Sequence, residues 1–164
     1  MAKMIILFLC THNSARSQMA EGLLRYLYGE KYEVFSAGTN PTRVHPLAIK
    51  AMAEIGIDIS RQYSKSIEEF SDVEIGLAVT VCRSSPKTTC VLCSSPTAMG
   101  RPEIINAKLH KTKHYLLHGF GDPSDAEGTD EEKLVAFRRT RDEIKGWIIE
   151  EFADLKLENI ESGV

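Results

Sequence analysis

Hydrophobic and polar positions along the chain fall into short apolar runs that alternate with helical patterns. Four short apolar runs are typical of strands in a parallel sheet, and they span residues 4–9, 33–37, 74–81 and 113–117. Three stretches repeat their apolar residues at helical spacing, and they span residues 19–27, 45–55 and 131–154. Strands that alternate with helices favour right-handed crossovers. The pattern therefore predicts an α/β three-layer sandwich, in which helices flank a four-stranded parallel sheet.

The length of 164 residues suits one domain with a substantial core. We expect a single domain over residues 1–157 and a frayed tail over 158–164. Residues 83–112 show no sustained periodicity and form a longer connection than most compact domains use. We expect this connection to be a mobile segment with a functional role.

Composition and charge exclude several classes of protein. Lysine and arginine number 20 against 23 aspartates and glutamates, a net charge of −3 that argues against a nucleic-acid partner. The longest apolar run, residues 4–10, is far shorter than a membrane span and lacks the cleavage site of a signal peptide. We therefore expect a cytoplasmic protein that contacts neither nucleic acid nor membrane.

The four cysteines are Cys10, Cys82, Cys90 and Cys93. Without an export signal, cysteines are more typical of chemistry than of disulfide staples, although any one alone also fits a buried apolar position. The C-x2-C pair Cys90 and Cys93 could join Cys82 in a zinc site, with a fourth ligand from His110, His114 or His118. Because a second C-x2-C pair is missing, we predict no metal site.

Cys10 and Arg16 stand six positions apart, between a predicted strand and a predicted helix. Backbone N–H groups of such a loop, with the positive end of the helix, form a cradle for a tetrahedral oxyanion. Arg16 adds a planar donor for two oxygens, and this environment favours a Cys10 thiolate over a thiol. The predicted anion-binding loop consists of Thr11, His12, Asn13, Ser14, Ala15 and Arg16.

Four further side chains have predicted roles at this loop. Ser17 can cap the helix and donate to the thiolate, and Asn13, a residue type that tolerates left-handed backbone, is expected to hold the shape of the loop. Cys82 and Asp122 follow later strands, and ligands of such sheets bind beyond the carboxyl ends of the strands. The competing interpretation makes Cys10 a core residue and Arg16 a solvated charge. His12 fits equally a titrating neighbour of the anion and a histidine that points to solvent.

Residues 10–22, CTHNSARSQMAEG, resemble the signature of thioredoxin-coupled arsenate reductases with the low-molecular-weight protein tyrosine phosphatase fold. The resemblance continues through residues 36–38, 45–49, 55–60, 121–123 and 137–144. It implies that Cys10 is the nucleophile, Arg16 the anion clamp and Ser17 the thiolate partner. It also implies Asp122 as general acid and Cys82, with a following cysteine, as a redox relay. No cofactor is implied.

Both branches of this family form a bond between the loop sulfur and the anion, so the loop alone does not separate reductase from phosphatase. Arsenic(V) can accept two electrons when a second thiol attacks the Cys10 sulfur, a role that suits Cys82. Cys90 is the predicted final thiol of the relay, and Cys93 is the alternative. Ser124 stands where phosphatases of this fold usually place an aromatic residue, which favours the reductase. A tyrosine phosphatase is the alternative function.

The resemblance also implies partners and departures. Arsenate is the expected substrate, phosphate and sulfate are competing anions, and the external dithiol can be thioredoxin, glutaredoxin with glutathione, or mycothiol. Ala15 replaces a cysteine found in many relatives. Some relatives bind potassium through Asn13, Ser36 and an acidic residue, but that acidic position falls at Lys65 here. We therefore predict no potassium site.

Overall fold

The computed structural model describes residues 2–83, 92 and 102–160. Its centre is a four-stranded sheet in the order β2-β1-β3-β4, in which all neighbouring strands are parallel. The strands are β1 (Met4–Cys10), β2 (Tyr32–Gly38), β3 (Ile75–Cys82) and β4 (Thr112–Phe120). The predicted parallel α/β sheet is thus confirmed.

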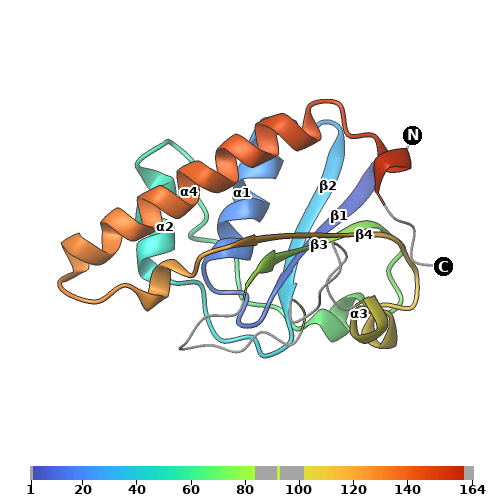
Figure 1. The fold of residues 1–164 in the computed structure, drawn as a ribbon, viewed down its shortest axis with the longest axis horizontal. Coiled ribbons are helices and arrows are strands. Elements are labelled where there is room, and N and C mark those ends of the chain that lie inside the picture. The colour runs from blue at the N-terminus through green and yellow to red at the C-terminus, as the bar shows by residue number, and fades with distance from the viewer. Residues whose placement is uncertain (1, 84–91, 93–101, 161–164) are drawn as a thin grey trace.

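Helices cover both faces of this sheet. The α-helices are α1 (Arg16–Tyr28), α2 (Pro46–Ala53), α3 (Pro102–Lys108) and α4 (Asp130–Phe152), and the short 3-10 helices are η1 (Ile67–Phe70), η2 (Pro123–Asp125) and η3 (Leu157–Asn159). Helices α1, α2 and α4 pack together on one face, whereas α3 lies on the other (Figure 1). The three layers are those that the sequence pattern predicts.

The two central strands explain why their sequences are continuously apolar. Every residue of β3 is buried, as are the last five residues of β1, because helices cover both faces. An aromatic cluster of Phe8, Trp147 and Phe152 joins β1 to α4 through edge-to-face contacts with centroids 5.5 to 6.4 Å apart. Burying each such side chain contributes about 1.5–3 kcal/mol. This packing fixes the carboxyl ends of the strands, where the candidate site lies.

The structure adds detail to two of the predicted segments. Helix α3 lies within residues 83–112, where no regular element is predicted, and its Ile105 is buried, as is Leu109 directly after the helix. A helix of seven residues is too short to display a helical period. Within the described part of the predicted tail, Ile160 is buried against the core, and the boundary of the tail stays a prediction.

None of the helices in the described ranges is both long and apolar enough to span a membrane.

Candidate active site

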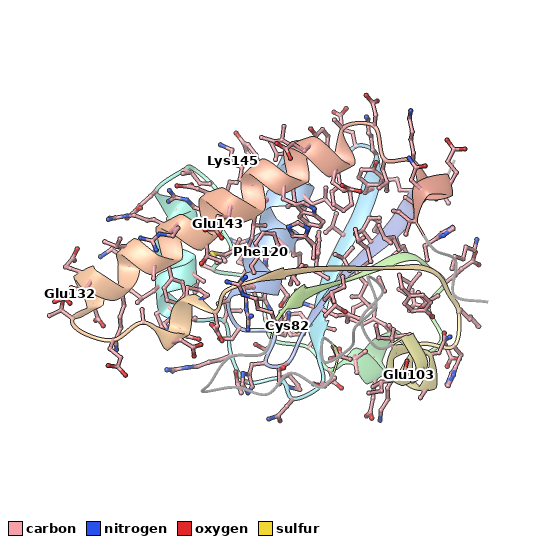
Figure 2. All side chains as sticks on the ribbon, viewed as in Figure 1. Cys82, Glu103, Phe120, Glu132, Glu143 and Lys145 are labelled. Atoms are coloured by element: carbon pink, nitrogen blue, oxygen red, sulfur yellow. The ribbon has the colours of Figure 1, made fainter. Side chains whose placement is uncertain are left out.

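Three strands end at the same edge of the sheet and bring the predicted reactive residues there. Cys10 is the last residue of β1 and Cys82 the last of β3, while Asp122 follows β4 by two positions. Cys82 is paired in register with Phe120, and Figure 2 shows these two residues at the same end of the sheet. Both cysteines are buried. The sequence therefore places all three residues at the correct edge.

The loop after β1 turns its carbonyl groups away from Cys10. The carbonyls of Thr11, His12 and Ser14 accept hydrogen bonds from the backbone N–H groups of Asn40, Thr42 and His45, over 2.8 to 3.1 Å. In a trans peptide the C=O and N–H groups point in opposite directions. The N–H groups of the next residues consequently face the inside of the loop, as an oxyanion cradle requires.

Two backbone features permit this tight loop. Asn13 has a φ of +50°, the left-handed region that asparagine tolerates better than most residues. Gly38 of β2 approaches the loop so closely that a Cβ atom there would lie 2.5 Å from the Thr11 carbonyl oxygen. A larger residue at position 38 would push the loop out of shape.

The Asn13 side chain ties the loop to three neighbouring segments. Its Nδ2 donates to the Ser17 and Ser36 hydroxyls, each over 2.8 Å, and its Oδ1 accepts from the Lys65 backbone N–H over 2.9 Å. Gln18 Nε2 also donates to Oδ1, over 2.9 Å. All four hydrogen-bonding positions of the buried amide are thus occupied. These contacts support the predicted role of Asn13 in holding the loop.

The Cys10 sulfur receives polar contacts from inside the loop. It lies 2.9 Å from the Ser17 hydroxyl and accepts the backbone N–H of Asn13 over 3.1 Å. Both groups can donate a hydrogen bond to a charged sulfur, and hydrogen bonds to a charged acceptor are stronger than those to a neutral one. The geometry thus suits a nucleophilic sulfur.

Arg16 and Asp122 join helix α1 to the end of β4. Arg16 Nη2 donates to Asp122 Oδ2 over 3.1 Å, and Nη1 donates to the Phe120 carbonyl over 2.9 Å. The second Asp122 oxygen, Oδ1, accepts the Ser124 backbone N–H and hydroxyl over 3.0 and 2.5 Å. The general-acid candidate is therefore held at a fixed position on the rim of the loop.

A cavity of about 140 Å³ lies over the loop. Its lining side chains are Cys10, His12, Ser14, Ala15, Arg16, Thr42, Asp122 and Ser124. Of the predicted loop residues, Thr11 and Asn13 are not part of this lining, and Asn13 is fully buried beneath it. Cys82 also lies outside the lining. The cavity suits a small tetrahedral anion, and the prediction that His12 neighbours the anion gains support.

Sequence analysis missed two residues of this region. Thr42 lines the cavity but stands in an irregular segment that carries no motif of its own. His45 caps α2, since its Nδ1 accepts the Leu47 backbone N–H over 3.1 Å, and burial lowers the pKa of His45, which the nearby Arg43 lowers further and Asp122 partly restores. The dipeptide His45-Pro46 signals a helix start, but not a position near Asp122.

Other predicted residues have different outcomes. Cys90 and Cys93 lie outside the described residues, so their relay and zinc roles remain predictions. Within the ranges that the structure describes, no group of three or more His, Cys, Asp or Glu side chains is arranged to hold a metal. Lys65, at the position where some relatives have an acidic ligand, is buried with its Nζ 3.7 Å from Glu21 Oε2.

Comparisons with known proteins agree with this geometry. An arsenate reductase of Halalkalibacterium halodurans is 43% identical over 154 residues, which cover 94% of this chain and 98% of that protein. The solved structure "An arsenate reductase in the phosphate binding state" superposes with a TM-score of 0.65 at 29% identity, covering 93% of this chain and 99% of the other. A thioredoxin-dependent arsenate reductase of Corynebacterium glutamicum gives a TM-score of 0.58 at 25% identity, covering 95% of this chain and 63% of the other.

A family model matches almost the whole chain, from residue 5 to residue 160, and therefore includes the loop, the four strands and the long helix α4. Because that match spans the fold as well as the site, the chain belongs to the low molecular weight phosphotyrosine protein phosphatase family.

Proposed function

We propose that the protein reduces arsenate to arsenite, with Cys10 as the nucleophile. The observation that carries this proposal is the position of the Cys10 sulfur beneath a small anion-sized cavity that Arg16 and Asp122 flank. The arsenate reductase of Halalkalibacterium halodurans, which the chain matches over nearly its full length, supports the same reaction. The enzyme needs no cofactor for this chemistry, because its thiols supply the electrons.

The first step is a substitution at arsenic. The Cys10 thiolate attacks arsenate and forms a sulfur–arsenic bond, while one arsenic–oxygen bond breaks. The departing hydroxyl takes a proton from the protonated form of Asp122 and leaves as water, and Asp122 becomes the carboxylate that can pair with Arg16. Backbone N–H groups and the Arg16 guanidinium hold the remaining oxygens. Arsenic remains As(V) throughout this step.

The electrons move in the second step. The Cys82 thiolate attacks the Cys10 sulfur, the sulfur–arsenic bond breaks, and its electron pair stays on arsenic, which leaves as arsenite, As(III). The two sulfurs are thereby oxidised to a Cys10–Cys82 disulfide. The end of β3, which carries Cys82, lies beside β1 in the sheet and so suits this attack.

The enzyme is then restored by thiol exchange. Cys90 attacks Cys82 and releases Cys10 as a thiolate, so that the disulfide moves to Cys82 and Cys90. An external dithiol reduces this second disulfide. We propose thioredoxin as the donor, because the similar enzyme of Corynebacterium glutamicum is thioredoxin-dependent.

A phosphatase activity of the same loop is the alternative. A phosphoryl group on Cys10 can pass only to water. A tyrosine phosphate substrate would also need an aromatic side chain that packs against its ring. The residue at that position, Ser124, instead donates its hydroxyl to Asp122 over 2.5 Å, and the cavity measures only about 140 Å³. These features favour a small inorganic anion.

The decisive experiment couples the purified protein to thioredoxin, thioredoxin reductase and NADPH, with Cys10→Ser as the blank. Arsenate should support NADPH consumption, and phosphate and sulfate should compete with it for the same cavity. Aryl phosphate hydrolysis is measured in parallel. Fast phosphate ester hydrolysis without arsenate-dependent NADPH oxidation would contradict the reductase and favour the phosphatase.

A further inference from the structure

Behind the loop, a lysine and a glutamate are buried together. The side chains of Lys65 and Glu21 are only 7% and 4% exposed, and their charged atoms lie 3.7 Å apart. Taking two charges out of water costs several kcal/mol for each ion, which a pair recovers only with good partners. Neither residue lines the cavity, and the mechanism above uses neither. The pair therefore calls for a physical role.

Both residues have the contacts expected of charged groups. Lys65 Nζ donates to the Tyr63 carbonyl over 2.9 Å and lies 4.5 Å from the centre of the Tyr63 ring, which are contacts that favour an ammonium. Glu21 accepts the Ser36 hydroxyl over 2.5 Å and Arg25 Nη2 over 2.6 Å. Arg25 is 46% exposed, so water screens its charge more than that of Lys65.

A chain of hydrogen bonds leads from Glu21 to the active site, and one of its members fixes the direction. The Lys65 backbone N–H can only donate, so the Asn13 atom that it contacts must be the oxygen Oδ1. The other end of the amide is therefore the NH2 group. It donates its two hydrogens to the Ser36 and Ser17 hydroxyls.

The remaining hydrogens follow from that assignment. Ser36 accepts from Asn13, and its own hydrogen goes to the Glu21 carboxylate, which in its charged form is an acceptor only. Ser17 also accepts from Asn13. Among its contacts with the described residues, the Cys10 sulfur is the acceptor left for the Ser17 hydrogen. The chain thus ends with a hydroxyl that donates to the sulfur, which is the arrangement that a thiolate needs.

We propose that Lys65 is a positioning residue for the reaction: its buried ammonium holds the Glu21 carboxylate in place, and the carboxylate orients Ser36, Asn13 and Ser17 so that Ser17 donates to the Cys10 thiolate. The inference rests on the proposed role of Cys10 as nucleophile, but not on arsenate as the substrate. Lys65 acts on the sulfur through this chain and through its charge, without contact with the substrate.

The other charged groups that face the pair do not replace Lys65. Burial lowers the pKa of Lys65 from its ordinary value of 10.5, and Arg25 adds to that effect, while Glu21 and Glu69 oppose it. On the side of Cys10, the charged or titratable groups that line the cavity are His12, Arg16 and Asp122. These groups stay in place when Lys65 is changed, so a shift in Cys10 reactivity would report the pair.

The test measures the rate of Cys10 alkylation by iodoacetamide as a function of pH. Mass spectrometry of the Cys10 peptide separates this thiol from the other three. In Lys65→Met the midpoint of the rate profile should move up by about 0.5–1 unit, or roughly three- to tenfold in thiolate fraction below the midpoint. Lys65→Arg should restore the wild-type profile. Lys113→Met, which removes an exposed lysine that pairs with Glu74, should not move the midpoint.

A second variant keeps the test decisive if Lys65→Met fails to fold. Ser36→Ala cuts the chain between Glu21 and Asn13 while it leaves the ion pair intact, and it should raise the midpoint similarly. In the double variant, the shift of the midpoint should be smaller than the sum of the shifts in the two single variants. An unchanged midpoint in folded Lys65→Met, or in Ser36→Ala, would overturn the inference. If the wild-type protein does not turn over arsenate, the proposed substrate is wrong, but the alkylation measurement still tests the role of Lys65.

Discussion

Arg16 and Asp122 form an ion pair in the lining of the cavity, with side chains only 6% and 9% exposed and nitrogen and oxygen 3.1 Å apart. One residue begins helix α1 and the other follows β4, so the pair connects distant parts of the chain. An incoming oxyanion competes with Asp122 for the same guanidinium. In the proposed mechanism, substrate binding is thus coupled to the separation of Asp122 from Arg16.

Replacement of the acid should slow adduct formation. In Asp122→Asn the departing oxygen has no proton donor, and loss of a positioned acid typically costs 10²–10⁴-fold. Single-turnover measurements, in which the arsenate-dependent loss of the Cys10 thiol is followed by rapid quench, give the rate. Asp72→Asn, which removes an exposed acidic side chain, is the matched control. An unchanged single-turnover rate in Asp122→Asn would exclude Asp122 as the acid.

Replacement of the clamp tests anion recognition separately. Arg16→Lys keeps the charge but loses the planar guanidinium. That group donates to the Phe120 carbonyl and, at the same time, to Asp122 or to a bound anion. We expect arsenate and sulfate to bind at least about tenfold more weakly, since a hydrogen bond to a charged group contributes about 1.5–3 kcal/mol. Calorimetric titration with sulfate measures binding without turnover. Wild-type affinity in Arg16→Lys would reduce Arg16 to a structural partner of Asp122.

The parts of this structure that the sequence predicts are those with local signals. Strands β1 and β3 are continuously apolar because both faces are covered, and the spacing of Cys10 and Arg16 indicates an anion loop. Helix α3 escapes prediction because seven residues are too few for a period. Lys65 lies 44 positions from Glu21, and the burial of their charges depends on a contact that no local pattern encodes.

The cysteine relay predicts different stalled states for different variants. Cys82→Ser should bind arsenate but fail to turn over, because no thiol attacks the Cys10–arsenic adduct. Cys90→Ser should release one equivalent of arsenite and stop as a Cys10–Cys82 disulfide. Cys93→Ser, the matched control, should remain active. Quantified arsenite and peptide mapping of the disulfides distinguish these states.

Two results would change the relay. A Cys82–Cys93 disulfide with Cys90 reduced would transfer the final role to Cys93. Four reduced thiols after arsenate treatment of the wild type would contradict the relay as a whole, because electrons for arsenite would then have no source within the chain.

The stability of the protein should decrease on acidification below the ordinary histidine pKa of 6.5. Burial lowers the pKa of His45, and also that of His118, where Glu151 opposes the shift in part. Below that pH the two histidines are therefore protonated to a greater extent in the unfolded chain than in the folded chain. The free energy of unfolding consequently decreases as the pH decreases through this window. His45 adds a structural reason, since protonation of Nδ1 removes the acceptor that caps α2. The carboxylates with lowered pKa, such as Glu54, lose their contribution only at a lower pH.

The matched variant for this effect is His45→Asn, because asparagine is a good helix cap that does not titrate. Urea unfolding between about pH 5 and pH 7.5 should show a smaller loss of stability in His45→Asn than in the wild type. His110→Asn, at an exposed histidine, should follow the wild-type profile. If the pH dependence of His45→Asn equals that of the wild type, the protonation of His45 does not contribute to the loss of stability. The other histidine with a lowered pKa is His118, which stacks on Trp147, and His118→Asn tests its contribution directly.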